Sequence, residues 1–110
     1  MNMNRNIFVK KNLIEKLIDI IRYIYDPEIS VNIYDLGLIY DIQIRQQANI
    51  KVIMTLTTPN CPVADSFLKE VKQKIQTIDT VKKIYIILTF YPKWDTEMLS
   101  EEARIKLELE

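Results

Sequence analysis

The chain has 110 residues, of which 48% are hydrophobic and 27% charged, the composition of a single globular domain. Basic and acidic residues both number 15, so the formal net charge is zero and the basic field that holds nucleic acid is not expected. Histidine is absent and Cys61 is the only cysteine, which excludes Ser-His-Asp and Cys-His catalysis and argues against a self-contained zinc site. No apolar run reaches the length of a membrane span, so we expect a cytoplasmic protein that binds neither membrane nor nucleic acid.

The first predicted element is a helix with apolar residues spaced three and four apart from Leu13 to Tyr25, the pattern of one buried helix face. Asn12 and Glu15 resemble a capping box at its start, although a start nearer Asn6 is equally compatible with the pattern. Residues 1–11 are otherwise interpreted as a flexible N-terminal tail. Pro27 disfavours helical geometry in the preceding residue, so the helix is predicted to end at or before that residue.

The remaining elements follow in a clear order. Residues 26–37 show neither the helical spacing nor the alternation of a strand, which predicts an ordered loop. Gly37, the only glycine, indicates a positive φ or a close approach of the backbone to another element. Alternating apolar residues over 38–45 and 50–56 predict a β-hairpin, and the spacing is helical over 63–78. A third strand over 81–90 and a short helix over 100–109 complete the order α-β-β-α-β-α. The prediction is an α+β protein, a small two-layer α/β domain that spans residues 1–110.

Cys61 lies where the second predicted strand gives way to the second helix. Pro62 suits the first helical position, which makes Cys61 the predicted N-cap and directs its thiol toward free backbone N–H groups. These groups lower a thiol pKa only modestly, and no histidine is present to act as a base. The position therefore favours a metal ligand over a nucleophile. The structural alternative is a small buried hydrophobic side chain.

Several acidic residues flank the two irregular segments and can act as an acid and base pair or as hard metal ligands. Three of them also have a structural interpretation: Asp26 before Pro27 is typical of a helix stop, Asp35 of a turn, and Asp65 of the first turn of a helix, where the dipole favours an acid. Trp94 lies among charged neighbours, where it either packs on the core or anchors a partner protein. The acidic candidates are Asp26, Glu28, Asp35, Asp41 and Asp65.

Four blocks of the sequence resemble one known family. They are DPEI at 26–29, VNIYDLGLIY at 31–40, TTPNCPVA at 57–64 and PKWDTEMLSEEAR at 92–104. Together they are similar to the SufT/PaaD-like family of iron-sulfur cluster maturation factors, and the resemblance extends over residues 13–109. The chain lacks the cysteine-rich C-terminal segment usual in PaaD proteins, which favours the SufT-like branch.

The resemblance implies a fold like that of iron-sulfur cluster assembly domains and an accessory, non-enzymatic role in the SUF system. It implies that Cys61 binds a metal or cluster and that Asp26, Glu28 and Asp35 form a supporting acidic loop. Because a typical cluster takes about four protein ligands, we expect iron or a labile iron-sulfur cluster that one chain does not hold stably. The implied partners are an assembly scaffold or client apoproteins, and a homodimer is left open.

Two other functions stay open at this point. One is a maturation subunit for an oxygenase system of the phenylacetyl-CoA epoxidase type, as in PaaD proteins. The other is a protein-interaction module in which Cys61 is purely structural and Trp94 contributes to the partner surface.

Overall fold

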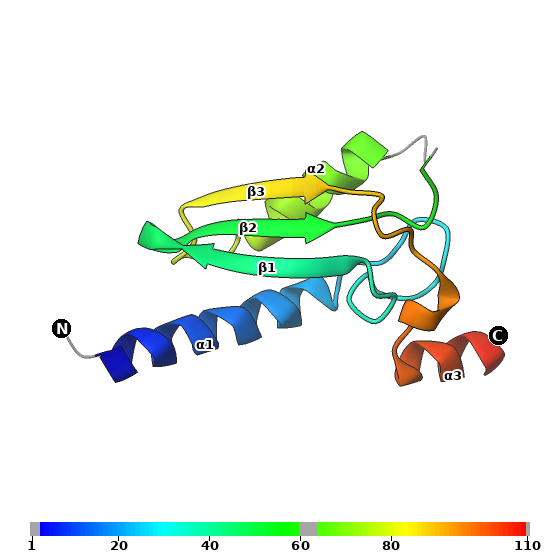
Figure 1. Ribbon diagram of the computed structural model, residues 1–110, viewed down its shortest axis with the longest axis horizontal. Coiled ribbons are helices and arrows are strands. Elements are labelled where there is room, and N and C mark those ends of the chain that lie inside the picture. Colours follow the sequence, from blue (N-terminus) through cyan, green and yellow to red (C-terminus); the bar gives the residue numbers. More distant parts are fainter. Residues whose placement is uncertain (1–2, 60–63, 110) are drawn as a thin grey trace.

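The computed structural model describes residues 3–59 and 64–109. Within these ranges the chain forms α1 (Met3–Ile21), β1 (Ile39–Arg45), β2 (Asn49–Met54), α2 (Ala64–Ile75), β3 (Lys83–Leu88) and α3 (Glu101–Leu109), with short 3-10 turns at Gln46–Ala48 and Thr96–Met98. The predicted order α-β-β-α-β-α and the α+β class are confirmed (Figure 1). The predicted ends of most elements differ from the observed ones by a few residues.

Helix α1 begins at Met3, well before the predicted start at Asn12. Residues 3–11 are part of this helix, and the capping box predicted at Asn12 and Glu15 lies inside it. The physical reason is that no glycine or proline interrupts the chain before Pro27, so nothing stops the helix from extending. The helix ends at Ile21, before the predicted limit, and the Tyr23 N–H donates to the Ile20 carbonyl oxygen (3.0 Å) in a tightened last turn.

The three strands form one sheet in the order β1-β2-β3. Strands β1 and β2 are antiparallel, which confirms the predicted hairpin, while β2 and β3 are parallel. A parallel pair needs a long connection, and α2 supplies it. The register shifts between Ile39 and Asp41, so Tyr40 is the extra residue of a bulge and the strict alternation predicted for 38–45 is broken there.

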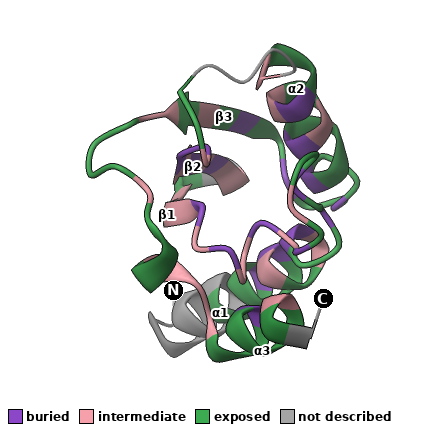
Figure 2. Ribbon diagram, turned by 90° about the vertical axis from the view of Figure 1, so that its right-hand side faces the viewer, coloured by how far each residue is buried: buried purple, intermediate pink, exposed green. Residues whose placement is uncertain are grey.

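The hydrophobic core lies between one face of the sheet and the helices α1 and α2. Ile50, Val52 and Met54 alternate along β2 and are fully buried on this face. Leu17 of α1 and Val71 of α2 pack into the same cluster. Figure 2 views the molecule along the strands, with the helices on one side of the sheet and the segment that follows β3 looping out on the other. The predicted two-layer architecture is therefore confirmed.

The C-terminal segment packs against the loop between α1 and β1. Gly37 has φ +81°, as predicted from its position, and a Cβ added there would clash with the Met98 carbonyl oxygen and lie 2.9 Å from the Met98 Cβ. The Ser100 N–H donates to the Asp35 carbonyl oxygen (2.8 Å), and Ala103 of α3 is buried. These contacts join residues that are more than sixty positions apart in the chain.

Candidate functional site

One end of the molecule collects the segments that the sequence singles out. The carboxyl ends of β2 and β3, the start of α2 and the loop after α1 all lie toward the right-hand end in Figure 1. Residues 55–63 connect the end of β2 to Ala64, the first residue of α2. In open α/β sheets, ligands bind outside the carboxyl ends of parallel strands, where such connections begin. The end of the sheet where β2 and β3 terminate is therefore the candidate site.

The predicted metal ligand Cys61 lies outside the described residues, together with Asn60, Pro62 and Val63. The predicted N-cap at Cys61 and first helical position at Pro62 stay predictions. Helix α2 is described from Ala64 onward and carries Asp65 in its first turn, in agreement with the helix-dipole interpretation of that residue.

Asp26 organises the start of the loop with its side chain. Its Oδ1 accepts hydrogen bonds from the backbone N–H groups of Glu28 (2.8 Å) and Ile29 (2.9 Å). Only 8% of the residue is exposed. This arrangement is an Asx turn, in which the carboxylate replaces a backbone acceptor and fixes the direction of the chain. Glu28, two residues later, takes part in this turn through its backbone N–H and is an exposed residue.

Asp35 closes the other end of the loop. Its Oδ2 accepts a hydrogen bond from the Asn32 Nδ2 (2.7 Å), and its own backbone N–H donates to the Asn32 Oδ1 (2.9 Å). The predicted acidic loop thus has two carboxylates engaged in local hydrogen bonds, those of Asp26 and Asp35. The third predicted acid, Glu28, is the one that the loop presents on its exposed side.

A cavity of about 380 Å³ joins this loop to the first turns of α2. Tyr25 and Pro27, the neighbours of Asp26, line one side, and Ser66, Phe67 and Glu70 line the other. The sequence analysis did not identify Glu70, which is half-buried and reaches this cavity from the second turn of the helix. Tyr25 was predicted as part of the buried helix face, but it is 52% exposed and its ring lies 5.4 Å from the Lys106 Nζ.

Trp94 is held by the fold itself. Its indole is half-buried against the hydrophobic core, and Nε1–H donates to the Leu36 carbonyl oxygen (2.7 Å). An indole N–H usually finds such a partner when the ring is buried. The geometry supports the core-packing interpretation over the partner-anchor one.

Thr55 is the first residue after β2 and opens the connection that leads to Cys61. The residue is fully buried, and its backbone N–H donates to the Leu38 carbonyl oxygen (2.9 Å). Its Oγ1 has no hydrogen-bond partner among the described residues. A buried hydroxyl without a partner is costly, and this one lies at the start of the connection between β2 and α2.

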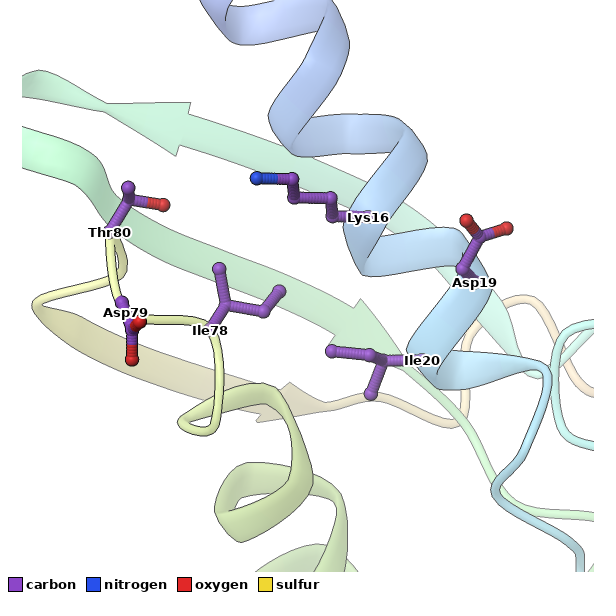
Figure 3. Close-up of a pocket in the computed structure, with 6 residues that line it drawn as sticks. All are labelled: Lys16, Asp19, Ile20, Ile78, Asp79 and Thr80. Atoms are coloured by element: carbon purple, nitrogen blue, oxygen red, sulfur yellow. The ribbon is translucent and has the colours of Figure 1, made fainter.

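A second cavity lies elsewhere, between α1 and the turn after α2. It measures about 410 Å³ and is lined by Lys16, Asp19, Ile20, Ile78, Asp79 and Thr80. Figure 3 shows the carboxylates of Asp19 and Asp79 pointing away from each other, so the two carboxylates do not converge on one binding position. None of the predicted site residues that the structure describes lines it.

The described residues alone do not form a metal centre. Across 3–59 and 64–109, no three carboxylate, imidazole or thiol side chains are grouped so that they hold a metal ion. No helix in the same ranges is long and apolar enough to cross a membrane.

The fold and the candidate site define a small α+β domain with one cysteine-bearing connection at the carboxyl edge of a parallel strand pair. The chain belongs to the family described as iron-sulfur cluster assembly protein, whose model matches residues 14–86. The family resemblance inferred from the sequence is thereby confirmed.

Individual relatives agree with this family. A protein of Porphyromonas gingivalis named Fe-S protein maturation auxiliary factor is 46% identical, over 84% of this chain and 89% of its own length. The Fe-S protein maturation auxiliary factor SufT of Staphylococcus aureus is 30% identical, over 76% of this chain and 96% of its own. The crystal structure of a domain of unknown function from Bacillus anthracis superimposes with a TM-score of 0.86, at 31% identity, over 91% of this chain and 95% of that one.

Proposed function

We propose that this protein is an accessory factor in iron-sulfur cluster maturation, which engages iron or a labile cluster through Cys61 and passes it to a client apoprotein. One observation carries the proposal: the only cysteine of this family member belongs to the connection from β2 to α2. Such a connection begins at the carboxyl end of a parallel strand, where ligands bind in open α/β sheets. The relatives named maturation auxiliary factors support the same role.

Chain connectivity supports a role of Cys61 near the acidic loop. Two residues, Pro62 and Val63, separate Cys61 from Ala64, so the three Cα–Cα steps between them span at most about 11 Å. The first turns of α2 border the cavity that Tyr25 and Pro27 line from the other side. Glu28 and Glu70 are the carboxylates that this arrangement offers as supporting ligands. Asp26 and Asp35 instead shape the loop through their hydrogen bonds.

The ligand count favours transfer over storage. A typical iron-sulfur cluster takes about four protein ligands, mainly thiolates, and this chain has one thiol. A species bound through one thiolate and one or two carboxylates is held weakly, so a scaffold, a client or a second copy must supply the remaining ligands. Weak holding suits a protein that receives a cluster from one partner and gives it to another.

The proposed role is not catalytic. Thiolate exchange at iron needs neither a general base nor a covalent intermediate on the protein, and the chain has no histidine to provide a base. A thiol that must stay reduced also fits the cytoplasm, where glutathione and thioredoxin keep cysteines free.

The test is anaerobic reconstitution with ferrous iron and sulfide, followed by transfer to a purified apoprotein client. We expect wild type to accelerate transfer and to show charge-transfer absorption, and Cys61→Ser to lose both. The control is Thr80→Cys in the Cys61→Ser background, which restores an exposed thiol away from the candidate site. Unchanged transfer by Cys61→Ser, or full rescue by Thr80→Cys, would contradict the proposed role of Cys61.

A further inference from the structure

Strand β3 presents a free edge. The sheet order β1-β2-β3 leaves no strand on its outer side within the described residues. The Thr89 N–H donates to the Met54 carbonyl oxygen (2.9 Å), so the odd-numbered residues of this strand direct their backbone groups toward β2. Because these directions alternate along a strand, Ile84, Ile86 and Leu88 direct their N–H and C=O groups outward.

Within β3 this edge has no proline and no bulge, and its one charged residue is Lys83 at the start of the strand. The sequence of β3 is KIYIIL, with no proline, and its pairing with β2 runs without a register shift. Proteins commonly protect an edge with proline, bulges or inward charges, none of which occurs within β3. Tyr85 and Ile87 add apolar surface on the side of the sheet away from the helices, where they are 52% and 43% exposed.

A groove runs between α2 and this strand, and its charged residues all have the same sign. Two adjoining cavities of about 430 Å³ and about 190 Å³ make up the groove and share Lys72, Ile84 and Tyr85 in their linings. The charged side chains that line them are Lys69, Lys72, Lys82 and Lys83, with no carboxylate among the lining residues. The groove therefore combines unpaired backbone groups, apolar surface and positive charge.

We propose that the free edge of β3 binds an extended acidic segment of a partner protein by strand addition. The added strand would pair its backbone with Ile84, Ile86 and Leu88. Alternate side chains would point to opposite faces, so acidic residues would meet the lysines of α2 while apolar residues cover Tyr85 and Ile87. The expected segment therefore alternates acidic and apolar residues over the length of β3.

Charge decides between this occupant and a second copy of the chain. Pairing of two β3 edges about a two-fold axis would bring two groove linings of four lysines each against one another, with no carboxylate in either lining. Like charges that face each other across an interface cost several kcal/mol, whereas an acidic segment gains from the same field. Among the described residues, none that lines the cavity near Pro27 also lines this groove.

The test uses a capped peptide in which valine and glutamate alternate over the length of β3, titrated into the full chain and followed by backbone amide NMR. We expect the largest shifts within Lys83–Leu88 and in the facing side of α2. Lys69→Glu combined with Lys72→Glu should weaken binding at least about tenfold. The matched control is Lys74→Glu, a change on the same helix that lies outside the groove and should leave affinity unchanged.

Peptide variants separate strand addition from simple charge attraction. Two peptides are methylated on alternate backbone nitrogens. Methylation of the nitrogens whose N–H groups point toward β3 should abolish binding, and methylation of the nitrogens that point away should leave it intact. Equal affinity for both methylated peptides, equal affinity for wild type and the double variant, or shifts centred on another face would each overturn the proposal. It would also be overturned by a stable dimer in sedimentation that Ile87→Asp disperses, because the edge would then be occupied by a second copy.

Discussion

At the scale of single residues, Asp26 illustrates how a candidate ligand can serve the fold. Its Oδ1 accepts two backbone N–H groups, those of Glu28 and Ile29, and Asp26→Asn keeps an oxygen in that position while it removes the charge. We therefore expect Asp26→Asn to fold with nearly unchanged stability and to retain cluster transfer. Asp26→Ala loses both hydrogen bonds and should cost about 1–3 kcal/mol in the free energy of unfolding. Urea denaturation and the transfer assay measure the two effects.

One result for Asp26→Asn would contradict the view that Asp26 only positions the loop. A stable Asp26→Asn protein that no longer transfers iron or cluster would make Asp26 a ligand in its own right. Glu28→Gln is the matched change two residues away, because Glu28 is exposed and is one of the acids in the proposed supporting set. We expect that change to weaken transfer without a loss of stability.

At the scale of elements, the sequence predicts what is local and misses what is distant. The helical spacing around Leu17 and the alternation around Val52 are sufficient to predict α1 and β2, because each pattern depends only on nearby residues. The parallel pairing of β2 with β3 leaves no comparable local pattern, since it depends on how α2 crosses the sheet. The bulge at Tyr40 is missed for a similar reason, because only its partner strand reveals the register shift.

The candidate site was predictable to a similar extent. The segment between β2 and α2 follows from the change in hydrophobic spacing before and after it. The sequence indicates a turn at Asp35 and a helix stop at Asp26, whereas the structure gives Asp26 an Asx turn of its own. Glu70 could not be assigned to the site, because its cavity forms only when residues near Pro27 pack against α2. An acid three positions after Phe67 on a helix gives no signal that distinguishes it from any solvated residue.

The C-terminal segment is attached to the loop before β1 by contacts that a single glycine allows. Gly37 combines φ +81° with a close approach to the backbone of Met98, so Gly37→Ala should both strain the loop and push the segment away. We expect a loss of about 1–3 kcal/mol in stability and faster amide hydrogen exchange throughout α3. Trp94, which donates to Leu36 in the same region, should show altered fluorescence.

Ala48 provides the opposite experiment in the same protein. It has φ +58° in the turn between β1 and β2, and Ala48→Gly should relieve local strain and leave exchange in α3 unchanged. We expect Ala48→Gly to leave the free energy of unfolding unchanged or to raise it slightly. If Gly37→Ala left α3 as protected as in wild type, the close approach to Met98 would not control the attachment of the segment.

At the scale of the whole molecule, one core holds both functional surfaces in place. The three strands can bury only one face, and α1 and α2 cover it, so the candidate site and the edge of β3 depend on the same cluster. A domain of this size usually unfolds as one cooperative unit. A change in the centre of the core should therefore affect both surfaces together, although neither contains the altered residue.

Leu17 is the position that tests this coupling. It is fully buried on α1, and Leu17→Ala should destabilise the fold by about 2–5 kcal/mol, because the neighbouring side chains cannot fill the space of the lost atoms. Ile14→Ala, at a more exposed position on the same helix, removes the same number of carbon atoms and should cost much less. Urea denaturation followed by Trp94 fluorescence and by circular dichroism should give one shared midpoint for each variant. Two separate midpoints for Leu17→Ala would mean that the segment carrying Trp94 unfolds independently of the sheet, and that the candidate site can open while the edge of β3 stays folded.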